Sequence, residues 1–161
     1  MSSLPEERIQ ELKLILPKSV KVPPNIRIPF AWVRVRGNRA FVSGHIALNP
    51  DGSIYEVRGK VGGEVSIEEG YKAARLTGLA ILSSLRQELG SLNRIKAWLR
   101  VFGMVNVAPG FKQTPAVING FTDLILEVFG EECGAHSRSA VGVAELPFGA
   151  PVEIEAEVEV S

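Results

Sequence analysis

Cysteine and histidine are scarce in this 161-residue chain, which has one cysteine, Cys133, and two histidines, His45 and His136. A single cysteine excludes an internal disulfide and any zinc site built from several thiolates. The two histidines are not closely spaced with Cys133, so we expect no metal, and no motif indicates another cofactor. Long uncharged apolar runs and a secretory signal pattern are also absent, and we therefore expect a cytoplasmic protein that does not enter membranes.

Net charge is lacking as well, because 18 basic residues balance 18 acidic ones. Such a chain has no overall attraction for a polyanion, and we expect no nucleic-acid partner. Its length and 45% apolar content fit one domain with its own core. We expect residues 29–161 to form that domain. Residues 1–28 should form an N-terminal helix to about Leu16 and then an extended connector, because prolines recur from Pro17 to Pro29.

Turn, capping and periodicity signals predict the element order βββαβαββ for the domain. A capping box begins a helix at Ser66, and a Thr-Pro pair begins another at Thr114. Strands are expected at residues 30–36, 39–43, 54–61 and 95–105, with two more after His136. This order indicates an α+β fold in which the two helices cover one face of a mixed sheet.

The last segment, residues 136–160, carries the strongest functional signal. Arg138 stands among small residues, and glutamates occupy every second position of the final strand from Glu153 to Glu159. A guanidinium is a planar, always-charged group that matches a carboxylate at two points, so Arg138 indicates a site for a small carboxylate ligand. The alternative is that Arg138 pairs with Glu157 or Glu159 on a solvated face, where ion pairs are weak.

We expect the last two strands to form an antiparallel hairpin around residues 147–150. The apolar alternation then places Arg138 on the same face as the glutamates, opposite Glu159, with Glu153 roughly 20 Å away. On this geometry Arg138 and Glu153 cannot share a site within one chain. A closed cyclic oligomer would bring the arginine of one subunit to the glutamate of another.

Three segments of the chain resemble the YjgF/RidA superfamily, the reactive intermediate deaminases once described as L-PSP endoribonucleases. They are Phe41-Val42-Ser43-Gly44-His45-Ile46 with Asn49-Pro50-Asp51-Gly52, then Arg138-Ser139-Ala140-Val141, then Leu146-Pro147 with Val152-Glu153-Ile154-Glu155. Their order and spacing match over residues 29–160. The resemblance implies a chorismate-mutase-like fold and a homotrimer with ligand clefts between neighbouring subunits.

The resemblance also implies roles for single residues. Arg138 would hold the carboxylate of a 2-imino acid such as 2-iminobutanoate or 2-iminopropanoate. Glu153 would orient or activate the water that hydrolyses the imine to a 2-keto acid and ammonia. Ser43 and Gly44 would line the cleft, and His136, two residues before Arg138 on the same strand, is a candidate for its rim.

Two positions depart from the family pattern. Phe30 stands where a tyrosine is usual, which removes a hydrogen-bonding phenol, and Ala140 stands where a cysteine is usual. Ala140 can still supply the backbone at that position. Whether the chain is an enzyme is therefore open, and the alternative is a non-catalytic protein that binds a small carboxylate in the same cleft. Ribonuclease activity is a third interpretation, against which the zero net charge and the lack of an aromatic basic platform argue.

Overall fold

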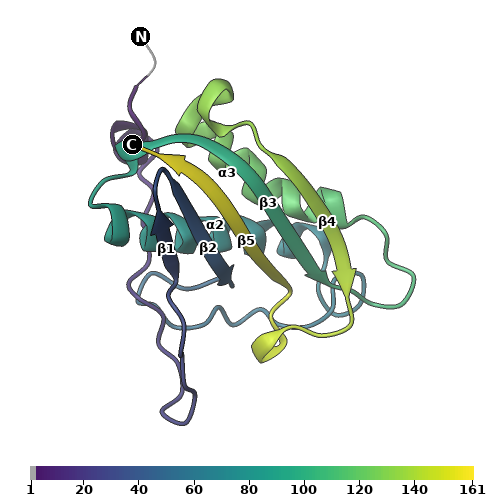
Figure 1. The fold of residues 1–161 in the computed structure, drawn as a ribbon. Coiled ribbons are helices and arrows are strands. Elements are labelled where there is room, and N and C mark those ends of the chain that lie inside the picture. The colour runs from purple at the N-terminus through teal and green to yellow at the C-terminus, as the bar shows by residue number, and fades with distance from the viewer. Residues whose placement is uncertain (1–2) are drawn as a thin grey trace.

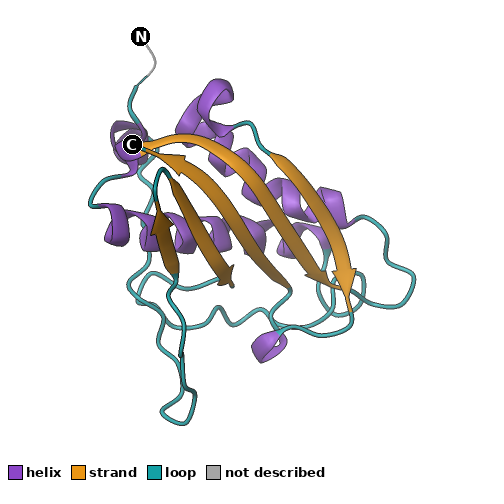
Figure 2. Cartoon of the chain, in the orientation of Figure 1, coloured by secondary structure: helices purple, strands orange, loops and turns teal. Residues whose placement is uncertain are grey.

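The structure, a computed structural model that describes residues 3–161, consists of a five-stranded mixed sheet with helices on one face (Figure 1 and Figure 2). The helices are α1 (Pro5–Glu11), α2 (Ile67–Leu89) and α3 (Thr114–Gly134), with short 3-10 turns at Leu92–Arg94 and Pro147–Gly149. The strands are β1 (Val33–Arg36), β2 (Arg39–His45), β3 (Ile95–Asn106), β4 (Ser137–Val143) and β5 (Val152–Val160). The expected α+β fold with α2 and α3 on one face of the sheet is confirmed.

The strand order β1-β2-β5-β3-β4 differs from the expected arrangement at the C-terminus. β5 pairs antiparallel with both β2 and β3, whereas β4 pairs parallel with β3 at the edge. The hairpin predicted for the last two strands is therefore wrong, because β3 lies between them (Figure 1). The reason is α3: a helix that connects β3 to β4 forms a crossover, and crossovers join parallel neighbours.

The strand expected at residues 54–61 is also absent from the sheet. Ile54 and Val61 make only isolated bridges, and Gly59 between them has a positive φ of 120° that interrupts an extended run. The segment instead packs across the ends of the strands, where the Val61 N–H donates to the Asn106 carbonyl at 2.8 Å. The observed order of strands and helices along the domain is thus ββαβαββ.

The helix boundaries follow the local signals closely. In α2 the Ser66 hydroxyl accepts from the Glu69 N–H at 3.1 Å, the Glu69 carboxylate accepts from the Ser66 N–H at 3.0 Å, and Gly90 ends the helix with φ 83°. In α3 the helix is interrupted at Gly130, whose φ is 74°. The N-terminal helix is shorter than expected and ends at Glu11.

A close approach of α2 and α3 explains a glycine in the middle of a helix. A Cβ on Gly120 of α3 would collide with the carbonyl oxygen of Tyr71 on α2. Across the same contact, a Cβ on Gly78 would lie 2.7 Å from Leu124. Glycine is a poor helix former, but here it lets two backbones approach and bury the core side chains beneath them. The helices are thereby held against the sheet. Each of the two parts of the site described below includes residues of one of these helices.

We expect Gly120→Ala to lower the free energy of unfolding by about 1–3 kcal/mol, because the added methyl forces α2 and α3 apart. Urea denaturation measures the change. Asn119→Ala is the matched control, since Asn119 is exposed on the same helix and alanine is the better helix former there. Equal stability of the two variants would contradict the close approach.

Candidate functional site

The residues predicted to form the site lie in two separate regions of the folded chain. Phe30, Gly44 and Glu153 line a pocket of about 390 Å³ between the connector, the end of β2 and α2. Arg138 lies instead on the edge strand β4, where its side chain contacts α3. One chain therefore holds two incomplete parts of the predicted site.

Arg138 and Glu153 lie on opposite faces of the sheet. Arg138 is paired with Val101, which is fully buried under the helices, whereas Glu153 is paired with Met104 on the helix-free face. The expectation that Arg138 shares the glutamate face is wrong, and Val141 occupies that face of β4 instead. Two strand spacings and three residues put the two Cα atoms roughly 14 Å apart. The two side chains point to opposite sides of the sheet, so they do not meet within one chain.

A hydroxyl on α3 positions Arg138. Its Nη1 donates to Thr122 Oγ1 at 3.0 Å and its Nη2 donates to the Pro115 carbonyl at 3.2 Å. Thr122 Oγ1 is also 3.0 Å from His136 Nε2, and His136 Nδ1 is 2.7 Å from the Gly134 carbonyl. These distances fit a neutral His136 that donates from Nδ1 and accepts at Nε2. Burial lowers the pKa of His136, and the charge of Arg138 acts in the same direction.

Arg138 keeps donors for a ligand. Two of the five guanidinium N–H groups are used by Thr122 and Pro115, which leaves three for a carboxylate. Ala140 is half-buried on the same face of β4, and its carbonyl accepts from Thr114 Oγ1 at 3.0 Å. The role of Thr122 was not predicted from the sequence. Its only sequence signal is that it lies next to the buried apolar residues of α3, such as Phe121.

Glu153 precedes Ile154, which pairs with His45 at the end of β2, just beyond an irregularity in the pairing of the two strands. A Cβ on Gly44 would collide with the Glu153 carboxylate, so a glycine at position 44 leaves room for that group. Burial raises the pKa of Glu153, and the negative charge of Glu155 raises it further. A carboxylate whose pKa is raised is a better proton acceptor than an ordinary carboxylate.

An aromatic row forms one side of the pocket. The Phe30 ring meets Trp32 edge-on with centroids 5.2 Å apart, and Trp32 lies 5.0 Å from the His45 ring. His45 Nδ1 is 2.6 Å from the Ser43 carbonyl and Nε2 is 2.8 Å from Ser84 Oγ. Nδ1 therefore donates and Nε2 accepts. Burial lowers the pKa of His45 to about 4, so the ring is neutral at physiological pH.

Ser43 makes a hydrogen bond outside the pocket. Its hydroxyl donates to the Ala31 carbonyl at 2.7 Å and ties the end of β2 to the segment just before β1. Ser43 does not line the 390 Å³ pocket, although its neighbours Gly44 and His45 do. From the sequence, His45 was considered only as a possible metal ligand. In the structure it is part of the pocket wall.

Two further observations concern the part of the chain that the structure describes. Within residues 3–161, no three His, Cys, Asp or Glu side chains are grouped so that they could hold a metal ion. None of the helices in the same range is long and apolar enough to cross a membrane.

Comparison with known proteins shows the family. Residues 18–152 match the family described as "YjgF/chorismate mutase-like, putative endoribonuclease", and the chain belongs to this YjgF/RidA family. Protein TCP17 of Trypanosoma cruzi is 43% identical over 125 residues, which are 78% of this chain and 77% of TCP17.

Two solved structures are similar over almost the whole chain. Protein Atu1372 of Agrobacterium tumefaciens has a TM-score of 0.84 and 36% identity, covering 98% of this chain and 92% of its own. A Shewanella oneidensis protein that carries the same endoribonuclease description has a TM-score of 0.87 and 29% identity, covering 98% of this chain and 100% of its own. The expected chorismate-mutase-like fold is confirmed.

Stability should fall on mild acidification because of His45. Its folded pKa of about 4 is below the ordinary value of 6.5, so the unfolded chain binds the proton more readily. This contribution is complete above pH 6.5 and is lost as the pH falls toward 4. Between pH 7.5 and 4.5 we expect wild type to lose about 2–3 kcal/mol through His45.

Denaturation of wild type and His45→Gln at both pH values measures that loss. The difference between them should shrink at pH 4.5, since glutamine does not titrate. His136→Gln, at a less buried ring, should show a weaker pH effect. A wild-type to His45→Gln difference that stays constant with pH would show that His45 is not held neutral.

Proposed function

We propose that this protein hydrolyses 2-imino acids to 2-keto acids and ammonia in clefts between the subunits of a homotrimer. The observation that carries the proposal is the division of the site. Arg138, on the helix-covered face of the sheet, has guanidinium N–H groups that Thr122 and Pro115 do not use. Glu153, whose pKa is raised, lies in the separate pocket at the end of β2. A rotation that closes a cyclic oligomer can set the β4 edge of one subunit against the pocket of the next.

The chemistry requires only the groups that the two parts supply. A protonated 2-imino acid, R–C(=NH₂⁺)–COO⁻, has an electrophilic carbon, and Arg138 would hold its carboxylate by paired hydrogen bonds. Glu153, ionised, would take a proton from water as the oxygen bonds to that carbon. Return of that proton to nitrogen gives a C–NH₃⁺ group, whose C–N bond breaks as the hydroxyl oxygen forms the keto group. The hydroxyl proton passes by way of Glu153 to the departing ammonia, which leaves as ammonium, and Glu153 is again ionised. Holding water and imine together provides much of the rate enhancement.

A second candidate is a binding protein that uses the same cleft without catalysis. Phe30 favours it, because a phenyl ring at the pocket wall provides no hydrogen bond for a water or an amine. In this case 2-keto acids bind in an Arg138-dependent way and imine hydrolysis is not accelerated. RNA cleavage, named in the family's description, is a third activity to assay on the same variants.

Mixing two inactive variants tests the shared site. Arg138→Ala and Glu153→Ala should each abolish hydrolysis of 2-iminobutanoate generated in the assay. Unfolding both and refolding them together at equal amounts distributes the subunits at random. A site is then intact when an unaltered Glu153 meets an unaltered Arg138, so about a quarter of wild-type activity should return.

The control for this experiment is each variant refolded alone, which should remain inactive. No recovery in mixed oligomers of confirmed composition would place both residues in one chain's site and contradict the divided cleft. A monomer in sedimentation would contradict it as well.

The pH dependence of activity should respond to Glu155. The raised pKa of Glu153 sets the acid limb of the rate profile, since the carboxyl must be ionised to accept a proton. Glu155→Gln removes a neighbouring negative charge and should move that limb to lower pH. Glu88→Gln, at an exposed position on α2, is the charge-matched control and should leave the limb in place. An acid limb unaffected by Glu155→Gln would mean that another group titrates.

A further inference from the structure

The pocket beside Glu153 is larger and more apolar than a small imino acid requires. Its volume is about 390 Å³, and the connector contributes an aliphatic wall that includes Val22, Ile26 and Ile28. Ile46 and Phe148 line it from the end of β2 and from the turn before β5. Ligand pockets of this size usually bury an apolar group and fix it with a few polar contacts.

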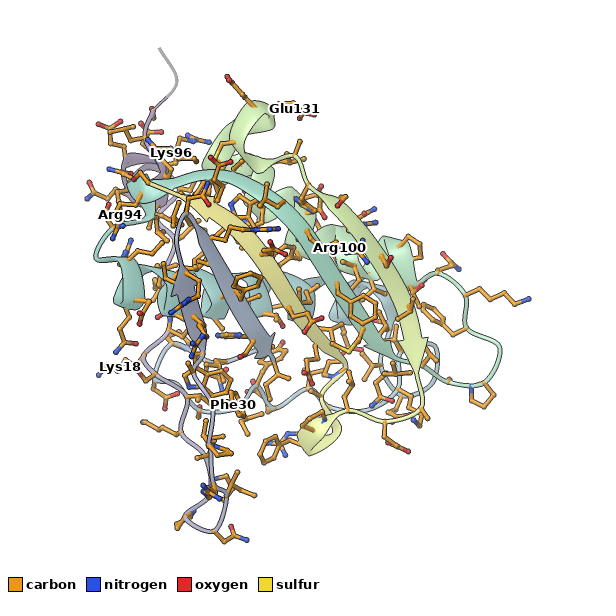
Figure 3. The ribbon with its side chains drawn as sticks, viewed as in Figure 1. Lys18, Phe30, Arg94, Lys96, Arg100 and Glu131 are labelled. Carbon is orange, nitrogen blue, oxygen red and sulfur yellow. The ribbon has the colours of Figure 1, made fainter. Side chains whose placement is uncertain are left out.

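Exposed apolar side chains gather around this pocket. Ile26, Phe30 and Phe148 are among the few large apolar residues with more than a third of their surface exposed, at 38%, 52% and 36%. All three line the pocket, and Figure 3 shows Phe30 where the connector reaches the sheet. An apolar surface that is left open in this way marks a site of interaction, and its position on the pocket wall favours a ligand there.

The backbone at Phe148 supports the same interpretation. Its φ of 59° lies in the left-handed region, which is uncommon for a bulky side chain and costs about 1–3 kcal/mol. Such strain persists where the surroundings fix it and is often found at ligand sites. Here the strained conformation belongs to a turn whose phenyl ring lines the pocket.

The charges of the pocket set the orientation of a ligand. Lys18 is the only lysine or arginine among the lining residues, and it is exposed (Figure 3). His45 and Ser84 satisfy each other by a 2.8 Å hydrogen bond, so this part of the wall offers no free charge. Glu153 repels a carboxylate, which therefore points away from the pocket. An apolar tail, in contrast, finds matching walls.

We propose that the pocket takes the side chain of the substrate, and that the preferred substrates are 2-imino acids with a long aliphatic or aromatic side chain. This inference rests on the proposed function, because it takes Arg138 of a neighbouring subunit as the carboxylate anchor. The connector, residues 18–30, is then the part of the chain that determines specificity, since it supplies most of the aliphatic wall. A two-carbon side chain would leave most of that wall in contact with water.

Titration calorimetry with a series of 2-keto acids tests the inference. Affinity should rise about fourfold for each added methylene, hence about fifteenfold from 2-oxobutanoate to 2-oxohexanoate. Phenylpyruvate should bind at least as tightly as 2-oxohexanoate. Rates of hydrolysis of the corresponding imines, formed in the assay by an amino acid oxidase, should follow the same order in kcat/KM.

Filling the pocket provides the matched variant. Val22→Trp should remove the advantage of the longer acids, so that 2-oxohexanoate binds no more tightly than 2-oxobutanoate, and Ile28→Trp is a second variant at the same wall. Ile15→Trp is the control, because Ile15 is 65% exposed and lies outside the pocket lining. Circular dichroism and thermal unfolding verify that each variant is folded.

The outcomes separate this inference from the proposed function. Arg138-dependent binding with no chain-length preference would overturn the inference and leave the proposed function standing. A chain-length preference with absolute affinities that Arg138→Ala leaves unchanged would support the apolar pocket and overturn the carboxylate anchor. Failure of every acid in the series to bind would overturn both.

Discussion

The position of β5 between β2 and β3 is the constraint on which the rest of the structure depends. Its backbone pairs antiparallel on both sides, so the nine residues of β5 join the hairpin of β1 and β2 to the pair of β3 and β4. Alternate residues such as Ile154 and Val158 are fully buried under the helices, whereas the glutamates between them face away. Without β5 the two parts of the sheet would share no hydrogen bonds.

The same strand order separates the functional groups. β5 carries Glu153 in the middle of the sheet and β4 carries Arg138 at its edge, on the other face. Burial then acts differently on the two. A carboxyl removed from water holds its proton more readily, which raises the pKa of Glu153, while a guanidinium keeps its charge at any physiological pH. In the function that we propose, one chain supplies the proton acceptor and the carboxylate anchor without bringing them together, and this division favours a cleft shared between subunits.

Features that depend on neighbours in the sequence were predicted well. The capping box at Ser66, the start of α3 at Thr114 and the length of β3 were correct, because caps and periodicity involve residues only a few positions apart. The close approach at Gly120 was identified only in the structure, because its partner Tyr71 lies on another helix. The predicted hairpin between the last two strands was wrong, because the crossover through α3 pairs β4 with β3 instead. Paired residues such as Val101 and Arg138 are 37 positions apart, which local patterns do not reveal.

The sequence by itself determined the residue types of the site, the helices and the α+β class, because these follow from local chemistry and from the motifs around Arg138 and Glu153. The tertiary structure alone decided which face each side chain occupies, through a strand order that local patterns do not encode. It also decided that Thr122 holds Arg138, that His45 is neutral, and that the connector closes an apolar pocket. These contacts join segments far apart in the chain, and the folded core fixes their distances.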